Sequence, residues 1–221
     1  DAGLAAPLAN PRLRVTTVTG EPIAENDDWG QAANAADLQA LGYAPAHPQE
    51  AALLLTLHPD VPYTVLVDGV DAATGLALVE ILDPQRTVAL NPRLINLSSR
   101  SWVGRGDDLL IGGLILDGGD TPRRILVRVL GPTLAEAQLG DPLLENPRLT
   151  LTTLDGQVLA ENDDWAQSPE AAAITAAGLA PPDPREPALL LTLNPRTPYT
   201  VLVHGVDDTT GLVLLEILEL P

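Results

Sequence analysis

The chain repeats a long stretch of its own sequence. Residues 10–85 recur as residues 146–221 at a constant offset of 136 positions, and 45 of the 76 aligned positions are identical. Self-similarity at a fixed period indicates that one structural unit is used twice. Residues 86–145 precede the second copy and have no counterpart before the first copy. We therefore expect an incomplete repeat unit at residues 1–85 and a complete one at residues 86–221.

Short apolar runs bounded by turn residues predict a β structure. Leu13, Val15 and Thr17 alternate with more polar neighbours before the turn at Gly20, which predicts a half-buried strand leading into a hairpin. Further strands are expected at residues 52–57, 63–67, 75–82, 88–97, 109–116, 124–130, 188–193, 199–203 and 211–218. We predict an all-β fold of tandem β-sandwich or jelly-roll-like units, with about eight strands in a complete unit.

One short helix is expected in each copy. Ser168 suits the N-cap, Pro169 the first helical position, and Gly178 the end of the helix. The helix of the first copy is expected from about residue 31 to the residue before Gly42. Both segments are short and rich in Ala, so we expect them to cap an end of the fold.

Composition excludes several classes of partner and chemistry. The net charge of −18 repels the phosphates of nucleic acids and of anionic membrane surfaces, so neither nucleic acid binding nor membrane insertion is expected. The chain has no Cys, which excludes disulfides, thiolate metal sites and Cys nucleophiles. It has no Lys either, so an assembly of copies is expected to be noncovalent or to use the chain termini.

An acidic tract recurs in both copies, as residues 25–28 and 161–164. Carboxylates beside a turn can form part of a Ca²⁺ shell, so Asp27, Asp28, Asp163 and Asp164 are candidate calcium ligands. Further oxygens are available on Asp68, Asp71, Asp207 and Asp208. The spacing matches neither an EF-hand loop nor the Gly-rich nonapeptide calcium motif. The alternative is that these side chains bond to backbone amides and build the loop, while Trp29 and Trp165 close the end of the sandwich.

The residues that catalysis would need are not arranged for it. His47, His58 and His204 align with Asp183, Asn194 and Asp68 in the other copy, so no His-based metal site or triad is repeated. Adjacent carboxylates in a turn do not provide the contrasting environments that acid–base catalysis uses. The sequence also lacks a Gly-x-Ser-x-Gly elbow. We predict that the chain is not an enzyme and has no cofactor other than calcium.

The sequence contains three smaller motifs. Arg105-Gly106-Asp107 spells an integrin-type tripeptide, which we interpret as a chance match in a Gly-Asp loop. The sequon at residues 96–98 lies in a predicted strand, where glycosylation is not expected. Local positive charge is found at Arg123, Arg124 and Arg128. These arginines are either a solvated strand face or a docking surface for an acidic loop of the next unit.

Several tracts resemble a known family of modules. Residues 155–165, 199–206 and 211–217 resemble the closing half of a bacterial secreted repeat domain that is similar to the pre-peptidase C-terminal β-sandwich. Residues 94–100, 103–113 and 125–132 resemble its opening half. The resemblance implies a noncatalytic module of extracellular array proteins, located outside the cell or at the cell surface.

Two functions follow as hypotheses. The first is a structural subunit of an extracellular fibre, filament or surface array, which assembles end to end with copies of itself. It rests on the incomplete unit, because half a sandwich exposes unpaired strand edges that a strand of a neighbouring subunit could cover. The alternative is an accessory carbohydrate- or calcium-binding module of a larger secreted enzyme or adhesin.

Overall fold

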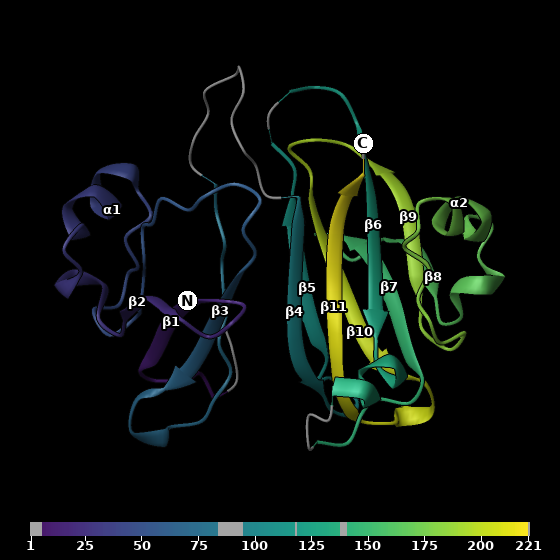
Figure 1. Cartoon of the computed structure of the whole chain (residues 1–221), viewed down its shortest axis with the longest axis horizontal. Coiled ribbons are helices and arrows are strands. Elements are labelled where there is room, and N and C mark those ends of the chain that lie inside the picture. Colours follow the sequence, from purple (N-terminus) through teal and green to yellow (C-terminus); the bar gives the residue numbers. More distant parts are fainter. Residues whose placement is uncertain (1–5, 84–94, 118, 138–140, 221) are drawn as a thin grey trace. The chain divides into compact units, whose positions relative to one another are not determined.

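The computed structural model describes residues 6–83, 95–117, 119–137 and 141–220, and it divides the chain into two compact units (Figure 1). We call Asp1–Leu82 the first unit and Asp83–Pro221 the second unit. The described residues form three antiparallel sheets and two short α-helices, so the prediction of a mainly β protein is confirmed. Within the described residues, no helix combines the length and the apolar character needed to span a membrane.

The first unit has a three-stranded antiparallel sheet. Its strands are β1 (Pro11–Thr17), β2 (Pro22–Asn26) and β3 (Tyr63–Gly69), in the order β2-β1-β3. A helix α1 (Ala35–Leu41) ends at Gly42, whose backbone is left-handed with φ of 78°, a conformation that favours glycine. Among the described residues of this unit, only the apolar side chains of Val15 and Leu38 are buried.

The second unit has two four-stranded antiparallel sheets, in the orders β5-β10-β7-β8 and β4-β11-β6-β9. The strands are β4 (Asn96–Val103), β5 (Leu110–Ile115), β6 (Arg123–Leu130), β7 (Pro147–Thr153), β8 (Val158–Asn162), β9 (Ala188–Leu193), β10 (Pro198–Gly205) and β11 (Gly211–Leu220). The other helix is α2 (Ala171–Ala176), and short 3-10 turns are η1 (Trp29–Gln31), η2 (Val70–Ala72), η3 (Pro132–Ala137), η4 (Trp165–Gln167) and η5 (Val206–Asp208).

An apolar core lies between the two sheets of the second unit. Val127 and Val129 on β6 and Leu149 and Leu151 on β7 belong to one buried cluster. Burial alternates along β10, as expected for a strand with one face toward a core. Leu126 points to the opposite face of β6, where it forms a second cluster with Ile174 of α2. The helix therefore covers the outer face of a sheet, not an end of the fold as expected.

Two predicted strands are absent from the first unit. Residues 52–57 and 75–82 are not strands, although their copies β9 and β11 are. In the second unit, β9 and β11 both pair with β6, which lies between them. The described residues of the first unit include no counterpart of β6, and a strand without a partner cannot satisfy its backbone N–H and C=O groups. The prediction of strands at these two places was wrong for this reason.

Apart from the strand expected at residues 88–97, the remaining strand predictions agree with the structure within a few residues. Strand β4 (Asn96–Val103) shares only residues 96 and 97 with that prediction and extends beyond its predicted end. Of the strand expected at residues 88–97, residues 88–94 lie outside the described residues, and the described strand β4 begins at Asn96. The described part of the second unit holds eight strands, β4 to β11, which is the number expected for a complete repeat. The helices begin later than predicted, at Ala35 and Ala171, because the short 3-10 turns η1 and η4 precede them.

Candidate functional site

The acidic tract forms the same turn in both units. The side-chain amide of Asn26 donates to the backbone oxygen of Asp28 at 2.9 Å, and its carbonyl accepts from the backbone N–H of Ala52 at 3.0 Å. In the second copy, Asn162 bonds to Asp164 and Ala188 in the same way, at 3.0 Å each. These bonds connect the end of one strand to the segment 26 residues later, so the Asn side chain has a structural role.

The carboxylates of this turn are also engaged in local bonds. The carboxylate of Asp28 accepts from the amide of Gln31, and that of Asp164 accepts from the amide of Gln167 at 2.6 Å. Asp163 lies 3.5 Å from a guanidinium nitrogen of Arg148. The hydrogen bonds therefore support the loop-building interpretation of Asp28 and Asp164.

The candidate calcium ligands do not converge within the part of the chain that the structure describes. No group of three or more His, Asp and Glu side chains there is placed to hold a metal ion. Asp68 instead binds Arg12 and Arg14, and the hydrogen bond from Arg12 holds the pKa of the Asp68 carboxyl below its usual value. Calcium binding by Asp27, Asp28, Asp163 and Asp164 stays a prediction.

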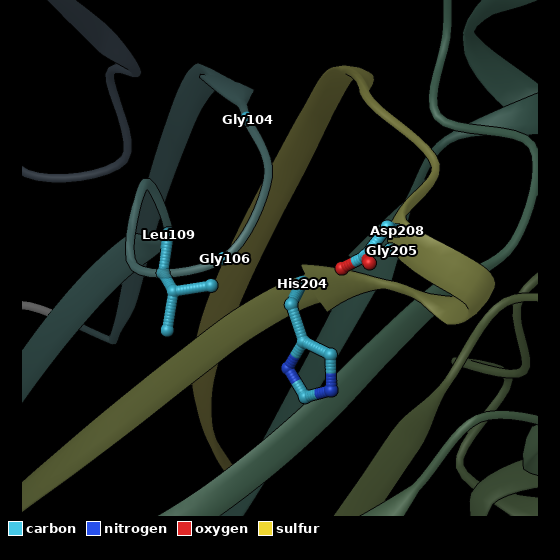
Figure 2. A pocket seen from close by; sticks show the side chains of 6 residues that line it. All are labelled: Gly104, Gly106, Leu109, His204, Gly205 and Asp208. Atoms are coloured by element: carbon cyan, nitrogen blue, oxygen red, sulfur yellow. The ribbon is translucent and has the colours of Figure 1, made fainter.

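A cavity of about 230 Å³ lies between the β4–β5 loop and the end of β10. Figure 2 shows its lining residues, which are Gly104, Gly106, Leu109, His204, Gly205 and Asp208. Burial, and secondarily the charge of Arg148, lower the pKa of His204. The cavity is smaller than the roughly 300–1,000 Å³ of most small-molecule sites. His204 and Asp208 are the two titratable residues of its lining.

The tripeptide Arg105-Gly106-Asp107 forms part of the β4–β5 loop beside this cavity. The Nε atom of Arg105 donates to the backbone oxygen of Asp208 at 3.2 Å. That bond ties the loop to the turn after β10, so Arg105 has a contact within the second unit. The sequon at Asn96 lies at the start of β4, where residues 96–98 pair with β11.

Most of the arginine cluster, which consists of Arg123, Arg124 and Arg128, forms ion pairs within its own sheet. The Nε atom of Arg128 lies 2.7 Å from a carboxylate oxygen of Glu216, and another nitrogen of Arg128 donates to the backbone oxygen of Leu179 at 2.7 Å. Arg123 lies 2.6 Å from a carboxylate oxygen of Glu219. Two of the three arginines thus join β6 to β11, while Arg124 is exposed. Arg123 and Arg128 therefore pair with acidic side chains of their own sheet, and docking of an acidic loop of another unit stays a prediction.

A buried carboxylate was not anticipated from the sequence. Glu186 is fully buried and accepts the backbone N–H of Gly131 and of Thr133, each at 2.9 Å, and the hydroxyl of Thr133 at 2.7 Å. It thereby fixes the loop that follows β6. The available signal was that Glu50 and Glu186 occupy the same position in the two copies, directly before the identical apolar runs of residues 52–57 and 188–193.

The first unit presents a broad apolar surface where the second unit has a core. We define the open surface as residues 52–57, residues 75–82 and strand β3. The side chain of Leu57 is 44% exposed whereas its copy Leu193 is 4% exposed. Val79 is 44% exposed and its copy Leu215 is 3% exposed. These differences follow from β4, β5 and β6, which pair with β11, β10 and β9 in the second unit only.

The open surface also has unpaired strand edges. In the sheet order β2-β1-β3, strand β3 pairs with β1 on one side and has no described strand on the other. Its copy β10 pairs with both β7 and β5. Unpaired edges next to exposed apolar side chains are typical of surfaces that accept an additional strand. The open surface is the strongest candidate for a functional site among the described residues.

No protein-family model matches the chain, and no curated protein matches it. The family to which the chain belongs is therefore not identified, and the resemblance to secreted repeat modules remains a prediction.

Proposed function

We propose that the chain is a noncatalytic structural subunit of an extracellular or cell-surface fibre, filament or array, built from tandem β-sandwich units. Copies of the chain associate end to end through the open surface of the first unit. The location outside the cell follows from the sequence resemblance to secreted repeat modules. No enzymatic role is included, because the sequence has no Gly-x-Ser-x-Gly elbow and no His-based triad that recurs in the two copies.

The observation that supports this proposal is the contrast between two nearly identical sequences. Residues 52–57 and 188–193 have the same sequence, and only residues 188–193, which pair with β6, form a strand. Apolar side chains that remain partly exposed in the first unit favour association, because an interface would remove their exposed area from water at about 25 cal/mol per Å².

The test is the state of association of the purified full chain. Analytical ultracentrifugation over a range of concentrations is expected to show mass increasing with concentration, and negative-stain images are expected to show linear assemblies. Substituting Val79 by Asp places a charge on the open surface and is expected to abolish association. The matched variant Leu154→Asp changes an exposed apolar residue of the second unit and is expected to leave association intact. A chain that stays monomeric at every concentration would refute the proposal.

A second candidate is a carbohydrate- or calcium-binding accessory module, which the repeated acidic turn favours. Asp27 and Asp163 occupy the same position in both copies and have exposed or half-exposed carboxylates. Calorimetric titration with calcium, combined with the melting temperature, tests this candidate. Heat release and stabilisation that disappear in the double variant Asp27→Asn, Asp163→Asn would support it, and the absence of both effects at millimolar calcium would exclude it.

A further inference from the structure

We propose that the outer face of strand β4 binds a glycan that carries uronic acid residues, with one sugar ring on Trp102 and the sugar carboxylate at Arg100. This inference goes beyond the proposed function, because it concerns the second unit and does not depend on association through the open surface. We define the β4 face as five outward side chains of β4 and β11. They are Ser98, Arg100, Trp102, Leu212 and Leu214.

The register of the sheet places these side chains on its outer face. Trp102 on β4 lies opposite Leu212 on β11, and directly opposite residues of antiparallel strands point to the same side. The next residue of β11, Val213, belongs to the core cluster between the two sheets. Successive side chains of a strand point to opposite faces, so Leu212 and Trp102 point away from the core. Arg100 and Ser98, two and four residues before Trp102, share its face.

The β4 face is open to solvent. The side chain of Trp102 is 46% exposed, and those of Ser98 and Arg100 are exposed as well. Helix α2 covers the outer face of this sheet at β6, where Ile174 packs against Leu126. In the sheet order β4-β11-β6-β9, strand β4 is an edge strand and has one described neighbour. Trp is highly buried on average in folded proteins, so a half-exposed Trp on an open sheet face is available to a partner.

Arg100 supplies an unpaired positive charge beside Trp102. Among the residues that the structure describes, Arg100 has no ion pair and no side-chain hydrogen bond, whereas Arg123 and Arg128 of the same sheet both bind carboxylates. The carboxylate of Glu216, which lies on the same face, is already paired with Arg128. The planar guanidinium of an arginine can bind a carboxylate through two parallel hydrogen bonds. Arg100 is therefore complementary to an acidic group of a partner.

The combination of Trp102 and Arg100 indicates the chemistry of that partner. The two residues are two positions apart on one strand face, which separates their Cα atoms by about 6.6–6.8 Å. A pyranose ring has an apolar face of C–H groups that stacks on the negative face of an indole ring, and the carboxylate of a uronic acid projects from the rim of the same sugar. One uronic acid unit can therefore contact both side chains. A long nucleic acid strand is disfavoured, because the net charge of −18 repels its phosphates.

The experiment titrates the isotope-labelled full chain with trigalacturonate and follows the indole N–H signals by nuclear magnetic resonance. The signal of Trp102 is identified by its loss in Trp102→Phe. Trigalacturonate is expected to shift this signal and to leave the signals of Trp29 and Trp165 unchanged, because these two residues lie in turns η1 and η4. An unshifted Trp102 signal, or equal shifts of all three signals, would overturn the inference.

Removal of charge from either partner tests the contact with Arg100. The methyl ester of trigalacturonate keeps the sugar rings but has no negative charge, and it is expected to bind about fivefold more weakly. Arg100→Gln is expected to weaken binding of trigalacturonate by a similar factor and to leave binding of the ester unchanged. Arg124→Gln changes another exposed arginine of the same sheet and, as the matched control, should bind trigalacturonate as the unsubstituted chain does. Equal affinities of the unsubstituted chain for the two sugars would overturn the contact with Arg100.

Two further measurements address the class of partner and the proposed function. Poly-glutamate that shifts the Trp102 signal at a lower concentration than trigalacturonate does would identify an acidic peptide as the partner and overturn the glycan. The variant Val79→Asp, in which association is blocked, should bind trigalacturonate with unchanged affinity, because the β4 face and the open surface share no residue. Binding that is lost in this variant would overturn the assignment of the site to the β4 face of a single chain, whereas a chain that never associates but binds trigalacturonate would overturn only the proposed function.

Discussion

At the scale of single residues, identical side chains have different environments in the two units. Glu186 is buried and bonded to the loop after β6, while Glu50 is exposed. Asn26 and Asn162 make the same two bonds in both units, because all their partners lie within the repeated sequence. A residue whose partners are local is predictable from its own copy. The environment of a residue whose partners lie outside the repeat cannot be predicted from its copy.

We predict that Glu186→Gln lowers the free energy of unfolding by about 1–3 kcal/mol. The amide has one acceptor oxygen in place of two and brings a donor group next to the N–H groups of Gly131 and Thr133. Urea denaturation followed by circular dichroism measures the change. Glu50→Gln is the matched control in the same buffer and should change stability by less than about 0.5 kcal/mol in the unassembled chain. Equal effects of the two substitutions would contradict the assigned role of Glu186.

The lowered pKa of His204 predicts that the free energy of unfolding depends on pH. Burial lowers its pKa below the unfolded value of 6.5, so the unfolded chain binds the proton more tightly than the folded chain. The contribution of His204 is therefore fully present above pH 6.5 and is lost as the pH falls through the lower folded pKa. Urea denaturation between about pH 8 and pH 5 should show this loss, and His204→Gln should remove that part of the slope. If the free energy of unfolding changes with pH as steeply in His204→Gln as in the unsubstituted chain, the pH dependence comes from other groups.

At the scale of elements, a strand forms only where a partner strand is present. The sequence Ala-Leu-Leu-Leu-Thr-Leu occurs at residues 52–57 and 188–193, and it is a strand only beside β6. Local propensity is the same in both copies, so the difference comes from pairing over a long separation in the chain. The turns behave differently. Gly20 and Gly156 have the same left-handed φ of 86°, because the turn depends on its own residues.

The same substitution in the two copies should have unequal effects. Leu193→Ala removes a buried side chain and is expected to destabilise the second unit by about 2–5 kcal/mol. Leu57→Ala changes an exposed side chain and is expected to lower the free energy of unfolding of the first unit by less than about 0.5 kcal/mol in the unassembled chain. Hydrogen–deuterium exchange of each unit in the full chain reports the two stabilities separately. Comparable losses in both units would mean that residues 52–57 are already buried in solution.

At the scale of the whole molecule, strong negative charge opposes the association that the exposed apolar surface favours. The chain has a net charge of −18, so copies repel one another at low ionic strength. The apolar contacts of the open surface do not weaken with salt. Association therefore depends on which of these two effects is larger under the given solution conditions.

Salt is expected to strengthen association. Raising the ionic strength to 0.1 M shortens the range of repulsion to about 10 Å, while contacts that become buried in the interface are screened much less. Sedimentation equilibrium at low and moderate sodium chloride concentration measures the association constant, with the monomeric Val79→Asp variant as the reference for nonideal behaviour. An association constant that falls with added salt would show that ion pairs, not apolar contacts, dominate the interface.

The sequence by itself determined the mainly antiparallel β structure, the hairpin turns, one short helix in each copy and the Asn-centred acidic turn. All of these depend on hydrogen bonds or periodic burial within a short stretch of chain. Only the tertiary structure decided that residues 52–57 and 75–82 are not strands, that Arg123 and Arg128 bind β11, and that Glu186 is buried. Each of these depends on β6 or the loop that follows it, which lies outside the repeated sequence and supplies the partner groups.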